Sequence, residues 1–214
     1  MNKVHADTIE RLAEELQPVR PMKARDGYLL AGAAGAVTLM AVVLVAGMWD
    51  GVVTGEASPF FAVVNGLLLV VGLAGIAASV ALAGPHVGNR QDSANWALAM
   101  LGVLPLAALA SAIGAPAGLS DTLVDPHALT CFLSGSVASA LTFVALAFWL
   151  KRGAPVSTVS AGTVAGAAAG AVGSFAYGMS CPIDGVAHLG IWHVLPVALC
   201  AAIGRIVMPR FLRW

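Results

Sequence analysis

Residues 27–49 read GYLLAGAAGAVTLMAVVLVAGMW, and this stretch decides the fold class of the chain. It contains no charged side chain, and about 20 apolar residues in a helix are enough to cross the hydrocarbon core of a bilayer. The rest of the chain has the same character, because 59% of all residues are hydrophobic and 10% are charged. A soluble domain has about 25% charged residues. We therefore expect an all-α integral membrane protein.

Five other stretches have a similar length and composition, so we expect six transmembrane helices in one membrane domain over residues 27–214. The expected spans are residues 27–49, 59–83, 96–113, 129–150, 157–177 and 186–208. In the fifth span, Gly162, Gly166 and Gly170 recur at every fourth position, which lets helix backbones approach closely. Such packing can join helices of one chain or of two copies, so the sequence leaves a homo-oligomer open.

Basic residues predict the orientation, because Lys and Arg gather on the cytoplasmic side of membrane proteins. The eleven Lys and Arg lie in the N-terminal tail, in the second-to-third and fourth-to-fifth connections, and toward the C-terminus. The other three connections carry acids only: Asp50, Glu56, Asp121, Asp125 and Asp184. We expect a multi-pass protein of a bacterial inner membrane, surrounded by the lipid bilayer, with both termini cytoplasmic.

The cytoplasmic tail, residues 1–26, contains a short amphipathic helix. Asp7 and Glu10 fit a capping box at its start, and Pro18 ends it. One face carries the apolar residues Ile9, Leu12, Ala13 and Leu16. A helix of about ten residues is too short to be stable alone in water. The helix therefore needs a surface on which to fold. Its polar face is acidic and it has no aromatic residue, which favours a partner protein over the lipid surface. The chain's own loops are the alternative.

Few polar side chains lie inside the expected spans, which contain no Asp, Glu or Lys. Transporters and proton relays usually have ionisable groups near the middle of the membrane. Asn65 is the one strongly polar side chain well inside a span, and we expect it to form a hydrogen bond between helices. The cytoplasmic segments contain no Ser/His/Asp set and no phosphate-binding loop, so we expect no enzyme and no catalytic residue.

Two of the three cysteines lie at the outward side. Cys131 begins the fourth span, Cys181 lies between the fifth and sixth, and Cys200 lies ~20 Å deeper by helical rise. Only Cys131 and Cys181 are therefore expected to meet. A disulfide between them suits an oxidising compartment, although two free thiols are an equal alternative.

Histidines lie close to these cysteines in the sequence. His127 is one helical turn before Cys131, and His188 and His193 follow Cys181. Thiolate and imidazole are ligands of zinc and other soft or borderline metals, so these five residues are candidate metal ligands. Their spacing matches no fixed metal motif, and hydrogen bonding is the alternative role for the histidines.

Three features together resemble a known family. They are TIERLAEELQPVRPM ahead of the first span, the six spans, and a cysteine in the fourth span with another in SCPIDGVAHLGIWHVLP. The chain resembles the NrsF-like family of six-span bacterial anti-sigma factors, negative regulators of an extracytoplasmic-function (ECF) sigma factor of the SigF type. The resemblance rests on L-x-x-x-L-x-P-V-x-P, which begins at Leu12, and on WHxLP, which begins at Trp192.

The resemblance implies that the tail holds an ECF sigma factor at the membrane. The implied sigma-binding residues are Ile9, Leu12, Ala13, Leu16, Pro18, Val19, Arg20 and Pro21. A periplasmic stress signal, either redox or heavy metal, would act on Cys131 and Cys181 and release the sigma factor. We expect no contact with nucleic acid, because the chain lacks a basic patch.

Two other functions remain open from the residues alone. One is a transporter of a small molecule or metal ion that uses the outward Cys and His residues. The other is a membrane thiol–disulfide enzyme, which needs a second redox pair and a quinone site. Neither requirement of that enzyme is visible in the sequence.

Overall fold

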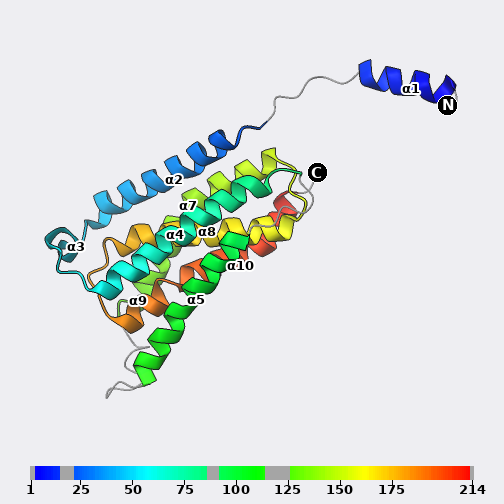
Figure 1. Ribbon diagram of the computed structural model, residues 1–214. Coiled ribbons are helices and arrows are strands. Elements are labelled where there is room, and N and C mark those ends of the chain that lie inside the picture. Colours follow the sequence, from blue (N-terminus) through cyan, green and yellow to red (C-terminus); the bar gives the residue numbers. More distant parts are fainter. Residues whose placement is uncertain (1–2, 15–21, 86–91, 114–125, 213–214) are drawn as a thin grey trace.

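The fold comes from a computed structural model of the chain, which describes residues 3–14, 22–85, 92–113 and 126–212. Every regular element within these ranges is a helix (Figure 1). The helices are α1 (Lys3–Glu14), α2 (Ala24–Ala46), α3 (Asp50–Thr54), α4 (Pro59–Leu82), α5 (Asp92–Ile113), α7 (Ala128–Arg152), α8 (Thr158–Gly178), α9 (Val186–Trp192) and α10 (Leu195–Phe211).

Five helical segments are long and apolar enough to cross a membrane within the described residues, where six were predicted. They are α2, α4, α7, α8 and the segment Val186–Phe211. The predicted third span falls in α5, whose shorter apolar part runs over Leu98–Ala110. At 1.5 Å per residue this part covers roughly 20 Å, which is less than the ~30 Å hydrocarbon core.

The predicted sixth span is found as the segment Val186–Phe211, but it is interrupted, because α9 ends at Trp192 and α10 begins at Leu195 with Pro196 in its first turn. Proline suits that position, since it has no N–H to donate. The predicted capping box at Asp7 is wrong because α1 already begins at Lys3. The first outward connection contains an unexpected short helix, α3.

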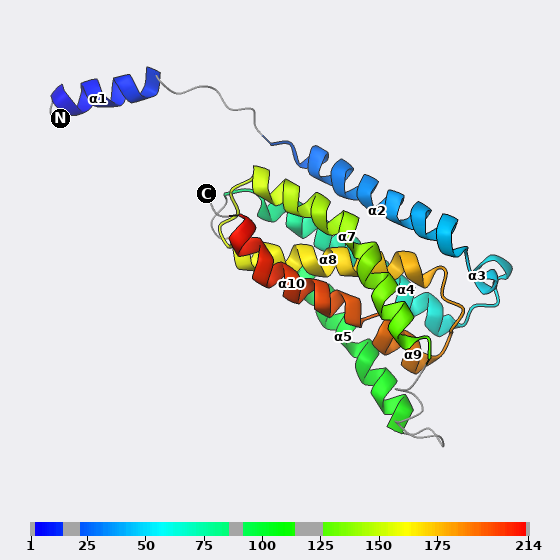
Figure 2. The same cartoon turned by 180° about the vertical axis from the view of Figure 1, so that it is seen from behind.

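Helix α8 is the centre of the bundle and packs against α4, α7 and α10 (Figures 1 and 2). The predicted close packing of its glycines is confirmed. A Cβ atom at Gly170 would lie 2.6 Å from Cα of Val197, and one at Gly166 would collide with the carbonyl of Cys200. The backbones of α8 and α10 therefore touch, and neither glycine position has room for a larger residue.

Helix α2 lies at the edge of the bundle, along α7 and α8. Its buried residues are few, and Leu44 and Val45 are 77% and 89% exposed. At its first turn a Cβ atom on Gly27 would lie 2.6 Å from Cε2 of Trp149 on α7. The indole N–H of Trp149 donates to the carbonyl of Val80 at 3.4 Å. This tryptophan therefore joins α2, α4 and α7 close to the point where the tail enters α2.

Candidate functional site

The structure brings Cys131 and Cys181 together at one end of the bundle. Cys131 lies in the first turn of α7, and Cys181 lies in the connection between α8 and α9. Their sulfur atoms are 3.5 Å apart, and both side chains are buried. A disulfide bond is about 2.05 Å long, so these two cysteines are in contact without being joined by a disulfide.

Two histidines complete a group of four side chains. Nε2 of His188 on α9 is 3.6 Å from Sγ of Cys181, and the rings of His188 and His193 are 5.5 Å apart. The ligand atoms of these four residues all lie within 4.8 Å of one another. His127 is exposed ahead of α7 and is not part of this group. Cys200 is buried on α10 and is not part of it either.

The break between α9 and α10 explains this group. His193 lies at the break and His188 lies on the short helix before it, so the turn brings both rings to the thiols. In a continuous helix, residues five apart would lie on different faces. The sequence contained the residues, but their spacing alone did not show that they converge.

The connection that carries Cys181 is fixed to two neighbouring elements. The hydroxyl of Ser180 donates to the carbonyl of Gly47, directly after α2, and the N–H of Trp49 donates to the carbonyl of Met179 at 2.9 Å. The carboxylate of Asp184 accepts a hydrogen bond from the N–H of Ser58 at 2.7 Å, at the start of α4. The Cys181 connection is therefore hydrogen-bonded both to the residues that follow α2 and to the start of α4.

Polar side chains that the sequence analysis did not select surround the thiols. The Tyr177 ring stacks on His193 with the ring centres 6.4 Å apart, and its hydroxyl lies close enough to the side chains of Ser134 and Cys131 to interact with both. Nε2 of His193 is buried and has no hydrogen-bond partner among the described residues. The sequence could have indicated Tyr177 as a neighbour of the thiols, because it lies four residues before Cys181 at the end of the fifth expected span.

Asn65 does not behave as expected. Its amide donates to the carbonyl of Phe61 at 3.0 Å, which is a bond within α4 rather than between helices. Its Oδ1 has no hydrogen-bond partner in the described part of the chain, and it lies against Gly178, where a Cβ atom would collide with it. The apolar surroundings of α4 favour bonding to the helix's own backbone, which needs no second polar group.

The environment favours the thiolate form of Cys181, which lies outside the spanning helices. The hydrogen bond with Cys131 lowers the pKa of the Cys181 thiol below its ordinary value. Burial raises this pKa, while His188 and His193 lower it further. The thiolate is the form that binds metals and reacts with oxidants. The group is therefore suited to either chemistry.

The tail presents an uncovered apolar face. Ile9 and Leu12 are 64% and 59% exposed, and Ala13 beside them is also exposed. Figure 1 draws α1 apart from the bundle. The other predicted sigma-binding residues, Leu16, Pro18, Val19, Arg20 and Pro21, lie outside the described residues.

The sequence profile described as "NrsF: Negative regulator of sigma F" matches residues 12–214. The chain belongs to the NrsF family. The predicted resemblance is thereby confirmed, and the matched range includes Cys131, Cys181 and the end of α1. A relative in Azospira oryzae, "Probable anti-sigma-F factor NrsF", is 29% identical over 211 residues, which cover 97% of this chain and 98% of the relative. No solved structure matches this chain.

Proposed function

We propose that this NrsF-family protein is an anti-sigma factor of the bacterial inner membrane that holds an ECF sigma factor through residues 1–26. The observation that carries the proposal is the uncovered apolar face of α1, where Ile9 and Leu12 are more than half exposed. Fully burying one such side chain stabilises a complex by about 1.5–3 kcal/mol. Glu10 and Glu14 on the polar face are exposed and suit the basic surface of a DNA-binding partner.

The five spanning segments support a membrane location. We propose α5 as the sixth crossing, because its 22 residues together cover roughly 33 Å, even though its apolar part alone is shorter than the hydrocarbon core. An even number of crossings puts both termini on one side. The Lys and Arg residues of the tail, together with Lys151 and Arg152 at the end of α7, support a cytoplasmic side. The Cys and His group then faces the periplasm. Family membership favours this regulator over the transporter and over the thiol–disulfide enzyme.

The proposed signal is a chemical change at Cys131 and Cys181. Oxidation would shorten the 3.5 Å sulfur–sulfur distance to about 2.05 Å. The alternative is a zinc or other soft metal ion held by Cys131, Cys181, His188 and His193, a Cys₂His₂ donor set. Donor atoms within 4.8 Å of one another suit a tetrahedral site, since zinc bonds of roughly 2.0–2.3 Å place ligand atoms roughly 3.5 Å apart.

A physical route connects this group with the tail. Ser180 and Met179, next to Cys181, form hydrogen bonds to the residues that follow α2. At its other end α2 follows directly on the tail, and there Gly27 packs against Trp149 of α7. We propose that the signal shifts α7 and α2 together and thereby weakens the binding of the sigma factor by the tail.

The test is binding of the full-length protein in nanodiscs to the ECF sigma factors of its own cell. Ile9→Asp/Leu12→Asp should weaken binding at least about 100-fold, because two apolar contacts worth about 3 kcal/mol or more are lost. The matched control is Arg11→Asp, which makes the tail more negative by the same two charge units at an exposed position outside the apolar face and should bind normally. Equal binding of both variants would exclude the proposed docking face.

A further inference from the structure

The four side chains of the Cys and His group already have the spacing of a metal site. Sγ of Cys181 is 3.5 Å from Sγ of Cys131 and 3.6 Å from Nε2 of His188. His193 completes the group, in which the four ligand atoms all lie within 4.8 Å of one another. Zinc bonds of roughly 2.0–2.3 Å in a tetrahedron place ligand atoms roughly 3.5 Å apart. One ion therefore reaches all four atoms after small movements.

The burial and charge of this group favour a divalent ion. Each of the four side chains is 4% exposed or less. Two thiolates and two neutral imidazoles carry two negative charges, which a divalent cation cancels and a monovalent cation does not. An uncompensated charge is unfavourable in a buried place. Tetrahedral coordination by two sulfur and two nitrogen atoms is typical of zinc.

An ion reaches this group from the water at one end of the bundle. Pro182 and Gly185 are exposed, and they lie in the connection that carries Cys181. Because Cys181 itself belongs to this connection, a movement of the connection admits the ion without a passage through the bundle.

A disulfide leaves two buried polar atoms without an explanation. Nε2 of His193 and Oδ1 of Asn65 are both buried, and neither has a hydrogen-bond partner among the residues that the structure describes. Such atoms are rare in folded proteins, because they have lost their hydrogen bonds with water. A bond between Cys131 and Cys181 would give a partner to neither atom. A metal ion in the group gives one to Nε2 of His193.

Asn65 approaches the second ring nitrogen of His193. A Cβ atom at Gly178 would collide with Oδ1 of Asn65 and would lie 3.5 Å from Nδ1 of His193. The glycine thus leaves both atoms beside the same point of α8. The NH₂ group of Asn65 donates to the carbonyl of Phe61 at 3.0 Å, which fixes the orientation of the amide. Oδ1 is therefore an available acceptor near Nδ1 of His193.

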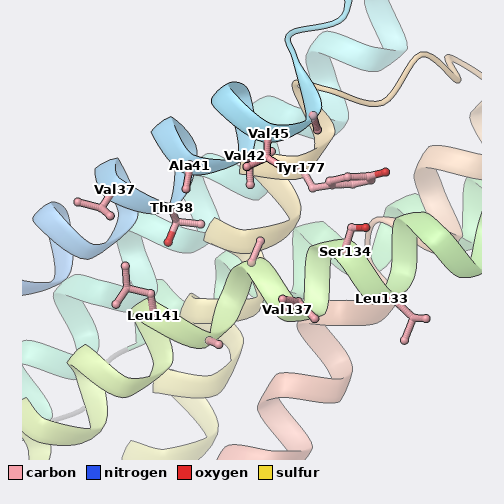
Figure 3. A pocket seen from close by; sticks show the side chains of 13 residues that line it. Val37, Thr38, Ala41, Val42, Val45, Leu133, Ser134, Val137, Leu141 and Tyr177 are labelled. Carbon is pink, nitrogen blue, oxygen red and sulfur yellow. The ribbon is translucent and has the colours of Figure 1, made fainter.

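Tyr177 borders the same imidazole ring. The two rings are stacked, with their centres 6.4 Å apart and an angle of 22° between their planes. Tyr177 also lines a pocket between α2 and α7, where Ser134 lies beside it (Figure 3). This contact sets the plane of the His193 ring. The position of the ring proton then decides which nitrogen is able to bind a metal.

We propose that the Cys and His group holds one Zn²⁺ ion, with Nε2 of His193 as a ligand, and that Asn65 positions this ring by accepting a hydrogen bond from its Nδ1–H. Ligating histidines usually donate their second ring N–H in this way, which fixes the tautomer. Binding releases the protons of both thiols to water, and no electron is transferred. This inference rests on the proposed function and deepens its metal alternative, because it names the ion, a ligand atom and the residue that orients it.

The test is a titration of the reduced full-length protein in nanodiscs with Co²⁺, a coloured substitute for Zn²⁺, under anaerobic conditions. We expect one ion per chain, with the strong visible bands of tetrahedral cobalt and a sulfur-to-cobalt charge-transfer band, and both should disappear when Zn²⁺ is added. His193→Ala removes one ligand and should weaken binding at least about tenfold. The matched control is His127→Ala, which changes an exposed histidine outside the group and should bind normally.

Variants of Asn65 test the positioning role. Asn65→Leu removes the acceptor with little change in volume and should weaken cobalt binding about 10–100-fold. Asn65→Asp keeps an acceptor at this position and should restore most of the affinity. Ser79→Ala is the matched control, because Ser79 of α4 also has a buried hydroxyl without a partner in the described part of the chain. It lies about 21 Å further along the helix, so cobalt binding should not change.

Thermal unfolding of the metal-free variants in detergent shows that each one is folded. The proposal is overturned if cobalt gives only the weak bands of six-coordinate cobalt, as expected of an adventitious ion only, or if His193→Ala binds cobalt as the unmodified protein does. Unchanged affinity in Asn65→Leu, or a loss that Asn65→Asp does not restore, would exclude Asn65 as the positioning residue.

Retention of the sigma factor is measured on the same nanodiscs. A protein that retains the sigma factor but has no tetrahedral cobalt site would remove this inference and leave the proposed function with its redox signal. A protein that binds cobalt as expected but no sigma factor would remove the proposed function and leave the metal site.

Discussion

Helices α8 and α2 are both rich in small residues, yet they have opposite places in the molecule. Over an 18-residue window, 78% of the α8 residues are buried, against 17% in α2. The glycines of α8 touch the backbone of α10, whereas Gly32 of α2 has open space around it. Helix α8 is thus the closely packed centre of the bundle. Helix α2 packs against it over a small part of its surface, follows directly on the tail, and is hydrogen-bonded to the Cys181 connection beyond its other end.

The largest effect is expected when the close packing of α8 against α10 is disrupted. Gly166→Leu puts a side chain into the carbonyl of Cys200, so we expect more than about 4 kcal/mol of destabilisation and loss of folded protein. The matched control is Gly32→Leu, because a Cβ atom at Gly32 meets nothing within 4 Å, and it should change stability by less than about 1 kcal/mol. Thermal unfolding in detergent checks both variants. Similar losses in the two would contradict the contrast between α8 and α2.

The second largest effect is expected when both thiols of the Cys and His group are removed and the fold is kept. In Cys131→Ser/Cys181→Ser, zinc affinity should fall at least about 100-fold, since two thiolate ligands are lost. The sigma factor should then stay bound under the inducing stress. Cys200→Ser is the control, because Cys200 is not part of the Cys and His group, and it should respond normally. A normal response of the double variant would exclude the cysteine pair as the sensor.

The smallest effect is expected when the hydrogen bonding between the Cys181 connection and the end of α2 is weakened. Ser180→Ala removes one hydrogen bond to the carbonyl of Gly47, which is worth about 1 kcal/mol. Disulfide formation should proceed as before, while the amount of sigma factor released per disulfide should fall severalfold. Sigma release and free thiols are measured in one titration with oxidant. Unchanged release would show that the signal does not pass through this bond to α2.

The family could be read from the sequence because its decisive features are local. Hydropathy predicted the five helical segments that are long and apolar enough to cross a membrane, although it also predicted a sixth. The period of apolar residues predicted the apolar face of α1, and the glycines at every fourth position predicted the close contact of α8. Each of these depends on residues that are neighbours in one helix. Such patterns need no knowledge of which helix packs against which.

The tertiary structure alone decided what surrounds the thiols. The break between α9 and α10 brings His188 and His193, but not His127, into the group of four side chains. Tyr177 joins these side chains because α8 ends where its ring stacks on that of His193. These arrangements join residues far apart in the sequence, so they depend on how the helices pack and not on the pattern within any one of them.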